Sequence, residues 1–392
     1  MKAVNKKFKR AIVLKGGGIV MPYIADDCVA ALDQVGVIVF GLSIRVLSGQ
    51  TFDSVRDETR EKLNEIKPDF ILSMDAGLVR DEPAFFEDLG IPVVAWFVDD
   101  PTIDMTPEKM FDKLMIFSWD REYIQILRDY GCKVVEYLPL GTNPAKFRRT
   151  PPTDPRCAPF ACDVSFVGSS LEKQSIRSII DNEYEPKLRE VMNECIRQHA
   201  EPPHTPVSEL LNEALGREKL ALVADNRRAF EGQIEIEAMM LYRSRALNRL
   251  ARFAPHVYGD DGWPALLDPG SVFRGPIVYD VDLPLLYSAS RINLNLTKSQ
   301  LKTSVNQRVF DAPACGGFVL TDKREDAELL FDTDKEIAVF NSYDDMEAKT
   351  AYFLENSEER ETRARMTKRH VLAEHTYAHR MRRILEVIGD YI

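Results

Sequence analysis

Residues 303–322 read TSVNQRVFDAPACGGFVLTD and contain, in order, a cap, a short helix, a stop and a buried strand. The helix is expected over 306–314, and three residues at or before its start can cap it: Thr303, Ser304 and Asn306. Pro313 and the glycine pair Gly316-Gly317 then end the helix, and the apolar run at 318–320 predicts a buried strand. A helix that leads directly into a buried strand is the repeating unit of a parallel sheet covered by helices.

The same alternation extends over most of the 392 residues. Before residue 140, apolar runs predict strands at 11–14, 37–42, 70–74, 92–98, 114–117 and 134–138. After residue 162, they predict strands at 163–168, 256–258, 277–279, 292–296, 318–320 and 337–340. Amphipathic segments such as Phe52–Ile66 and Asp120–Tyr130 lie between the strands, so the sequence predicts an α/β fold with parallel sheets.

Composition divides the chain into domains. Residues 146–162 are rich in proline and read as an extended linker, because proline fixes φ and lacks an N–H group. We therefore expect a Rossmann-like domain over 1–145 and a second over 163–375, which face a cleft. A helical insertion is expected in the second domain over about 175–254. A C-terminal helix over 376–392 is expected to pack back on the first domain.

The overall composition argues against several classes of protein. A net charge of −11 disfavours nucleic-acid binding, which needs a basic surface. No apolar run approaches the roughly 20 residues that cross a bilayer, and the N-terminal MKAVNKKFKR lacks the apolar stretch of a signal peptide. We expect a cytoplasmic protein. The basic stretches 6–10 and 360–369 can touch an anionic membrane, although a solvated terminus and helix are the simpler explanation.

Cysteine and histidine patterns predict no metal site. The six cysteines lack zinc-type paired spacing and are expected to be free thiols. His375 and His379 share a helical face, with His370 nearby. However, no HExxH pattern and no acidic third ligand accompanies them, so we expect no bound metal.

The helix at 306–314 offers the chemistry of a diphosphate site. N–H groups left free at its start would hold an anion at the positive end of the helix dipole. Four polar side chains share one face of this helix: Ser304, Gln307, Arg308 and Asp311. Arg308 can donate several hydrogen bonds to phosphate oxygens, and Asp311 can accept two from a ribose diol. The alternative is an ordinary capped helix with a surface Arg–Asp pair.

Two loops of the N-terminal half could serve an acceptor. Gly16, Gly17 and Gly18 follow the first strand and would allow close backbone approach, without matching a dinucleotide or P-loop fingerprint. Asp99 and Asp100 follow the strand at 92–98, where crowding can raise one carboxyl pKa and produce a general base. A cap before proline is the alternative role for this pair, and Asp75 is a second candidate base.

The segment FDAPACGGFVLTD (310–322) resembles the donor-site helix of GT-B glycosyltransferases, and most closely that of the CgeB-type, spore-maturation family. Six further segments are similar to parts of that family and occur in its order: KPDFILSMDAG (67–77), IPVVAWFVDDP (91–101), YLPLGTNPAKF (137–147), DVSFVGSSLEK (163–173), INLNLTKSQ (292–300) and HTYAHRMRRIL (375–385). The resemblance covers nearly the whole chain apart from the helical region around 175–254. It implies a GT-B fold.

The resemblance also implies roles at matching positions. Asp311 stands where relatives carry a ribose-binding carboxylate, and Gly168 and Ser169 stand at the loop that approaches the donor diphosphate. Thr303 occupies a position at which many relatives carry a carboxylate that contacts the donor sugar. Lys173 can add charge near the diphosphate or be an ordinary solvated lysine. Tyr258-Gly259 can contact the nucleobase through the backbone or form a simple turn.

These observations predict a glycosyltransferase that moves a sugar from a nucleotide diphosphate sugar to a hydroxyl group. The acceptor is a glycan, a protein or a small molecule, and the donor is of the UDP, GDP or TDP type. No cofactor is expected, because Arg308 and its helix dipole would stabilise the leaving diphosphate in place of a metal. A nucleotide-sugar-binding protein without turnover is the alternative, supported by Thr303. A dinucleotide-dependent oxidoreductase fits the glycine loop poorly.

Overall fold

The structure, a computed structural model, describes residues 8–15, 20–42, 52–103, 105–151, 153–175, 184–222, 224–298 and 301–391. The chain divides into two compact units. Unit 1 comprises Met1–Ala145, Leu301–Phe310 and His370–Ile392, and unit 2 comprises Lys146–Gln300 and Asp311–Arg369. The expected division assigned residues 301–310 to the C-terminal domain, whereas the structure groups them with unit 1.

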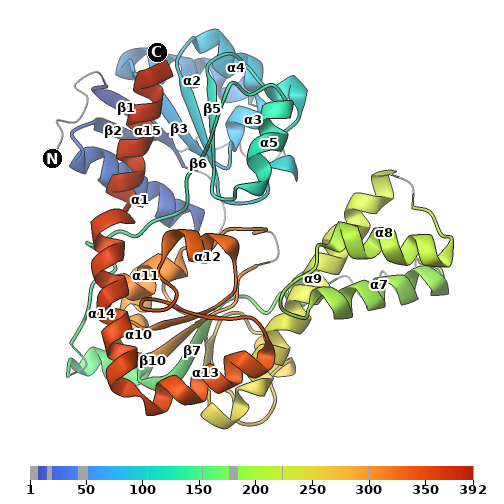
Figure 1. Ribbon diagram of the computed structural model, residues 1–392. Coiled ribbons are helices and arrows are strands. Elements are labelled where there is room, and N and C mark those ends of the chain that lie inside the picture. Colours follow the sequence, from blue (N-terminus) through green and yellow to red (C-terminus); the bar gives the residue numbers. More distant parts are fainter. Residues whose placement is uncertain are drawn as a thin grey trace. The chain divides into compact units, whose positions relative to one another are not determined.

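Unit 1 is built on a six-stranded parallel sheet with the order β2-β1-β3-β4-β5-β6 (Figure 1). Its strands are β1 (Arg10–Leu14), β2 (Ile38–Leu42), β3 (Phe70–Met74), β4 (Val93–Phe97), β5 (Leu114–Ser118) and β6 (Val134–Tyr137). Every residue of β3, β4 and β5 is buried, as expected for strands covered on both faces. The parallel sheet predicted for the N-terminal half is confirmed.

The helices of unit 1 lie between successive strands, except α15, which follows all the strands in the chain. They are α1 (Met21–Gln34), α2 (Asp53–Ile66), α3 (Leu78–Asp81), α4 (Pro83–Leu89), α5 (Glu122–Asp129) and α15 (Tyr377–Tyr391), with short 3-10 turns η1 (Pro101–Ile103) and η2 (Pro107–Lys109). Local sequence explains where several begin and end. Helix α4 begins at Pro83, whose φ suits a first helical position, and ends at Gly90 in the left-handed region.

The C-terminal helix α15 packs against α1. Its buried Arg380 donates to the carbonyl oxygen of Pro139 at 2.7 Å and to that of Leu140 at 2.8 Å. Burial lowers the pKa of Arg380 to about 10, yet the group stays cationic at neutral pH. The segment after β6 is also paired with the start of α15, since the N–H of Tyr377 donates to the carbonyl of Thr142 at 3.0 Å.

Unit 2 contains a second six-stranded parallel sheet, with the order β12-β11-β10-β7-β8-β9. Its strands are β7 (Cys162–Val167), β8 (His256–Tyr258), β9 (Val272–Gly275), β10 (Ser290–Asn295), β11 (Val319–Asp322) and β12 (Ala338–Phe340). Five of them lie where the sequence predicts strands. The strand predicted at 277–279 is wrong: β9 lies earlier, and the chain after it turns into α10 (Leu283–Ala289).

The remaining helices of unit 2 follow the strands or form an insertion. Those near the sheet are α11 (Arg308–Ala314), α12 (Glu325–Leu330), α13 (Tyr343–Glu355) and α14 (Ser357–Glu374). The 3-10 turns are η3 (Pro155–Phe160), η4 (Glu172–Gln174), η5 (Ala251–Phe253) and η6 (Trp263–Ala265). Helix α11 passes from unit 1 into unit 2, and α14 passes back into unit 1 near its end.

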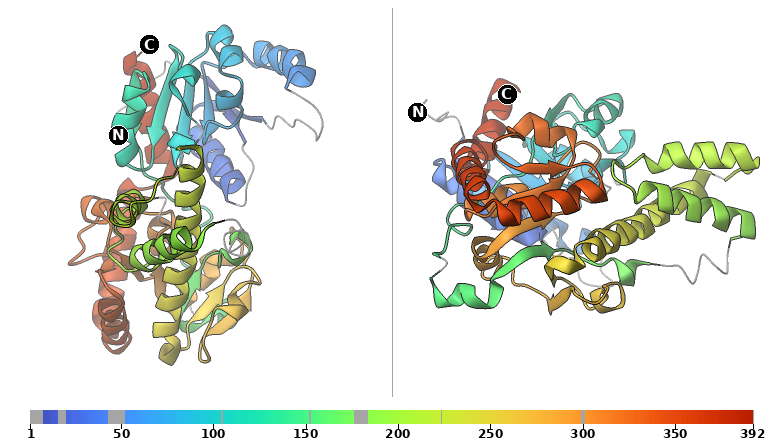
Figure 2. Two further views of the ribbon diagram at one scale, coloured as in Figure 1. Left: turned by 90° about the vertical axis from the view of Figure 1, so that its right-hand side faces the viewer. Right: turned by 60° about the horizontal axis from the view of Figure 1, so that its bottom comes forward.

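The insertion consists of α7 (Pro186–His199), α8 (Val207–Glu218) and the long α9 (Ala224–Arg249). Figures 1 and 2 show these three helices extending away from the sheet of unit 2. They share one hydrophobic core with the sheet, because Met192, Leu211 and Tyr242 of the insertion belong to the same buried cluster as Val164 and Ile292. The insertion is therefore part of unit 2 rather than a separately packed appendage.

Among the helices of the described residues, none combines the length and the apolar character that crossing a membrane requires.

Candidate functional site

The carboxyl ends of β7 and β8 carry a compact polar loop cluster in unit 2. The hydroxyl of Ser169 donates to Asp260 Oδ2 at 2.6 Å, and the N–H of Ser170 donates to the same oxygen at 2.9 Å. The N–H of Gly262 donates to Asp260 Oδ1 at 3.1 Å. Burial raises the pKa of Asp260, but these hydrogen bonds outweigh burial and hold it below its usual value. Asp260 is therefore ionised, and its carboxylate holds the two loops together.

Glycine at position 259 is required by the close approach of the two loops. A β-carbon on Gly259 would lie 2.2 Å from the carbonyl oxygen of Gly168 and 2.6 Å from Trp263 Nε1. That indole N–H donates to the Gly168 carbonyl at 2.8 Å, and the Gly168 N–H donates to the carbonyl of Tyr258 at 2.9 Å. The structure therefore brings together four residues that were predicted for the donor site: Gly168, Ser169, Tyr258 and Gly259.

Lys173 lies close to this cluster in the chain but faces solvent. Its ammonium group pairs with the exposed carboxylate of Asp261 at 2.6 Å. The hydrogen bond that Lys173 donates to Asp261 raises the pKa of Lys173, so the side chain stays charged. In this geometry Lys173 is an exposed, paired lysine.

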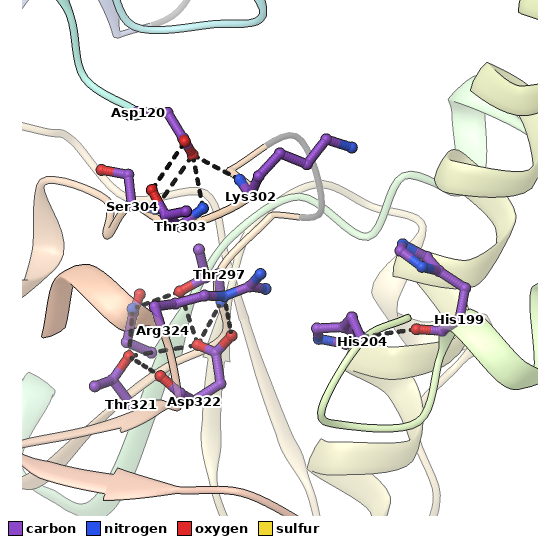
Figure 3. Close-up of polar contacts among 11 residues, drawn as sticks. Asp120, His199, His204, Thr297, Lys302, Thr303, Ser304, Thr321, Asp322 and Arg324 are labelled. Atoms are coloured by element: carbon purple, nitrogen blue, oxygen red, sulfur yellow. Dashed lines mark hydrogen bonds and ion pairs between the residues drawn. The ribbon is translucent and has the colours of Figure 1, made fainter. Parts of the chain in front are cut away.

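A second polar cluster lies at the carboxyl ends of β10 and β11. Asp322 Oδ1 accepts from the N–H of Thr297 at 2.9 Å and from its hydroxyl at 2.7 Å, while Oδ2 accepts from Arg324 Nε at 3.1 Å (Figure 3). Asn295 donates to the hydroxyl of Thr321 at 2.9 Å. The carboxylate and the guanidinium are both buried, so each depends on the other for charge compensation.

The helical insertion brings a histidine into the electrostatic field of this cluster. His204 lies in the turn between α7 and α8, and its Nδ1–H donates to the carbonyl oxygen of His199 at 2.7 Å. Its ring packs edge-on against Tyr242 of α9, with ring centroids 4.5 Å apart. Burial, followed by the positive charge of Arg324, lowers the pKa of His204 to about 4. The imidazole is therefore neutral at physiological pH.

The helix predicted over 306–314 begins later than expected. Helix α11 starts at Arg308, and Asn306 is its cap because Asn306 Oδ1 accepts the N–H of Arg308 at 3.1 Å. Ser304 and Gln307 precede the helix, so the prediction that they share a helical face with Arg308 and Asp311 is wrong. The competing hydrogen bond made by the Asn306 side chain sets this later start.

The N–H groups that were predicted to be free before this helix are occupied. In unit 1, the backbone N–H groups of Lys302, Thr303 and Ser304 donate to Asp120 Oδ2 at 2.6, 3.0 and 3.2 Å (Figure 3). The Thr303 hydroxyl donates to Asp120 Oδ1 at 2.9 Å. The prediction failed at this point because the occupant comes from the end of β5, far away in sequence.

Asp311 is buried within unit 2 rather than exposed. Its Oδ2 accepts the phenolic O–H of Tyr279 at 3.1 Å, and the Tyr279 ring packs edge-on against Phe147 with centroids 5.5 Å apart. Together with burial, the Asp311 charge raises the pKa of the Cys315 thiol. A surface position for Asp311, which was the alternative expectation, is therefore excluded.

The candidate bases of unit 1 differ in their surroundings. Asp100 Oδ1 accepts from the N–H of Thr102 at 2.8 Å and from its hydroxyl at 2.7 Å, which makes Asp100 the cap of η1. Asp99 has an exposed side chain. Asp75 lies at the end of β3 with a φ of 50°, and its Oδ1 accepts the N–H of Val98 at 2.7 Å. The loop Gly16, Gly17 and Gly18 lies outside the described residues.

The histidines near the C-terminus serve local packing. His375 is buried, and its Nδ1 lies 2.9 Å from a guanidinium nitrogen of Arg380. His379 Nδ1 lies 2.7 Å from the hydroxyl of Thr376. Within the described part of the chain, no group of three or more metal-ligating side chains is found. All six cysteines are unpaired.

Sequence reasoning missed four charged residues that organise these clusters: Asp120, Asp260, Asp322 and Arg324. Each stands at or within two residues of the end of a parallel strand. Because ligands of such sheets bind at the carboxyl ends of strands, that position was the available signal.

Comparisons with known proteins agree with this architecture. A family model described as glycosyl transferase-like matches residues 241–386, which include β8, β10, β11 and α11. No match was found among curated proteins.

Several solved structures share the fold over nearly the whole chain. The sucrose-phosphate synthase of Thermosynechococcus elongatus aligns with a TM-score of 0.60 at 9% identity, covering 98% of this chain and 100% of that one. Anabaena HepE in complex with UDP and glucose aligns with a TM-score of 0.57 at 11% identity, covering 97% and 100%. A glycosyltransferase from Rickettsia africae aligns with a TM-score of 0.53 at 10% identity, covering 97% and 98%. The chain has the GT-B fold.

Proposed function

We propose that this protein is a glycosyltransferase that moves a sugar from a nucleotide diphosphate sugar to an acceptor hydroxyl. One observation carries the proposal: four neighbouring parallel strands of unit 2 end in ordered polar loops, and three of those strands lie in the glycosyl transferase-like region. The carboxyl edge of a parallel sheet is the usual ligand site of such folds. The GT-B fold favours a glycosyltransferase over a dinucleotide-dependent oxidoreductase. The sequence also lacks the glycine fingerprint of dinucleotide-binding enzymes.

The donor is assigned to the residues of this edge and of the segment around α11. The backbone of Gly168, Ser169 and Gly259 is held in a fixed position by the packing of these loops, since a β-carbon at either glycine would clash with Phe166, Gly168 or Trp263. Asp311, oriented by the Tyr279 hydroxyl, would bind the ribose. Arg308 would bind and stabilise the leaving diphosphate. Supporting roles are proposed for Lys173 and Tyr258 of unit 2 and for Thr303, Ser304, Asn306 and Gln307 of unit 1.

The acceptor is assigned to unit 1, with Asp99 as the preferred general base. Asp75 accepts the N–H of Val98 and Asp100 accepts that of Thr102, and among the three carboxylates Asp99 is the most exposed to solvent. A base must reach the proton that it removes, so exposure favours Asp99 over its neighbour. The loop Gly16, Gly17 and Gly18 remains a proposed acceptor contact.

The finer assignments rest on sequence. The order of similar segments supports a CgeB-type enzyme, and a metal-free reaction is proposed because Arg308 would supply the positive charge that the leaving diphosphate needs. Six unpaired cysteines fit a reducing compartment such as the cytoplasm. The complex of HepE with UDP and glucose supports testing uridine nucleotides first.

A ligand screen and an activity assay test the proposal together. Thermal melting with UDP, GDP, TDP and ADP should give a rise for one nucleotide, because a ligand that binds the folded state stabilises it by mass action. Transfer and donor hydrolysis should then be measured with the matching sugar nucleotides, with and without EDTA. Absence of both activities with every donor would refute a transferase. Activity that EDTA abolishes would refute the metal-free reaction.

Matched arginine variants test the diphosphate assignment. Arg308→Ala should weaken nucleotide binding about 10- to 100-fold, the range expected for losing a charge-assisted hydrogen bond. Arg156→Ala is the control, because Arg156 is an exposed arginine that pairs with Asp154. Equal binding by the Arg308 variant and the control would remove Arg308 from the site.

A further inference from the structure

Asp120 is a buried carboxylate held by five hydrogen bonds. It follows β5, and its side chain is fully buried. One bond stays within its own loop, where Oδ1 accepts the N–H of Glu122 at 3.0 Å. The other four come from Lys302, Thr303 and Ser304, as described above. Most of what holds this carboxylate therefore comes from a segment about 180 residues away in sequence.

The donors of Lys302–Ser304 have the chemistry of an anion-binding loop. Three successive backbone N–H groups converge on one oxygen, which is the arrangement that also binds phosphate groups in proteins. Figure 3 shows the Lys302 side chain extending away from Asp120, so the backbone and not the ammonium group holds the carboxylate. None of the ion pairs found among the described residues includes Asp120. The loop therefore holds an anion by three backbone N–H groups and one hydroxyl, without a cationic side chain.

We propose that Lys302–Ser304 binds the diphosphate of the donor, and that Asp120 is an internal anion that occupies this loop until the donor displaces it. The proposal rests on the proposed function, since it assigns the donor's anionic group to this loop. Both anions need the same N–H groups, so they cannot be bound there at once. The occupancy of the loop by Asp120 then lowers the apparent affinity for the donor.

Asp120 makes hydrogen bonds within its own loop that do not involve Lys302–Ser304. The Ser118 hydroxyl donates to the Asp120 carbonyl at 2.7 Å, and the Asp120 N–H donates back to that hydroxyl oxygen at 3.2 Å. The hydrogen bond from the Glu122 N–H, the first residue of α5, does not depend on Lys302–Ser304. A displaced Asp120 therefore keeps one hydrogen-bond partner and a fixed backbone.

Two variants weaken the contact between Asp120 and Lys302–Ser304, one by changing the acceptor and the other by changing a donor. Asp120→Asn keeps the shape but removes the charge, and hydrogen bonds to an ionised acceptor are roughly twice as strong as neutral ones. Thr303→Val removes the hydroxyl donor while keeping all three backbone N–H groups and Asp120 itself. Since Thr303→Val leaves the hydrogen bond between Asp120 and the Glu122 N–H intact, it decides the question if Asp120→Asn fails to fold.

Calorimetric titration of the full-length protein with UDP and with inorganic pyrophosphate tests the proposal. Asp120→Asn should bind both about tenfold more tightly than the wild type, and Thr303→Val by a smaller factor in the same direction. Circular dichroism checks that each variant is folded. Unchanged or weaker binding by the folded variants would overturn the proposal while leaving the transferase assignment standing.

The pyrophosphate arm separates this proposal from the proposed function. If no nucleotide binds any form but pyrophosphate binds the variants more tightly than the wild type, the internal anion stands and the donor assignment falls. If neither ligand binds any form of the protein, both fall.

Discussion

Replacing Gly259 by alanine should destabilise unit 2 by about 3 kcal/mol, although only one methyl group is added. The reason is local crowding and not backbone strain, because Gly259 is not among the glycines with positive φ. Alanine can adopt this backbone conformation. What it cannot do is fit between the carbonyl oxygen of Gly168 and the indole of Trp263.

The size of the effect follows from two contributions. The new β-carbon would lie 2.2 Å from the Gly168 carbonyl oxygen and 2.6 Å from Trp263 Nε1, and both neighbours are held in place. Forcing extra carbon into such a site typically costs about 1–3 kcal/mol. Separating the two groups also breaks their 2.8 Å hydrogen bond and leaves a buried N–H and carbonyl unpaired, which costs about 1–3 kcal/mol more.

Urea denaturation of wild-type and variant protein measures this cost. The chain has three tryptophans, and Trp263 is the one that belongs to unit 2. Its fluorescence should report the earlier loss of unit 2, with far-UV circular dichroism as the second probe. The transition midpoint should fall without a change in its slope, since the area exposed on unfolding is nearly the same.

Gly232→Ala is the matched control because it adds the same methyl group in unit 2. A β-carbon at Gly232 would meet no atom within 4 Å, and the residue lies inside helix α9. This variant should be more stable than the wild type by up to about 1 kcal/mol, since alanine favours a helix over glycine. Two equal midpoints, or a Gly259→Ala protein within about 0.5 kcal/mol of wild type, would refute the crowding argument.

Two further predictions concern titrating groups. Burial lowers the pKa of His204 to about 4, whereas the same imidazole in the unfolded chain takes up a proton near pH 6.5. The free energy of unfolding should therefore fall by about 3 kcal/mol as the pH drops from about 6.5 to about 4. His204→Gln should lack this part of the pH dependence in urea melts at pH 7 and pH 5, and equal losses in both proteins would contradict the assignment. Burial also raises the pKa of Cys162, the least buried cysteine, to about 11, so native protein should react slowly with a thiol reagent at pH 8, while six thiols should react after denaturation. Rapid reaction of any thiol in the folded protein would contradict this.

Periodicity along the chain was sufficient to predict both sheets. The buried strands β3, β4 and β5 appear in sequence as uninterrupted apolar runs, because burial on both faces removes the need for polar residues. The glycine pair after α11 and the proline-rich stretch before β7 mark ends that depend only on local backbone preferences. The strand expected at 277–279 failed because a short apolar run does not distinguish a strand from an extended connection.

Residues that depend on distant partners could not be found in this way. Asp120 follows β5 like many loop carboxylates, and nothing near it shows that Lys302–Ser304 donates to it. The requirement for Gly259 depends on a carbonyl oxygen 91 residues earlier in the chain. The Asn306 side chain accepts the N–H of Arg308, and α11 begins only at Arg308. Ser304 therefore lies before the helix and not on the helical face predicted for it.

The sequence by itself determined the α/β class, the two parallel sheets, the helical insertion and the neighbourhood in which a donor site belongs. Only the tertiary structure decided which oxygen each N–H group meets, which carboxylates are buried and which glycine cannot be replaced. The physical reason is that backbone preferences and apolar periodicity act over a few residues, whereas hydrogen bonds and steric contacts at strand ends join segments that only folding brings together.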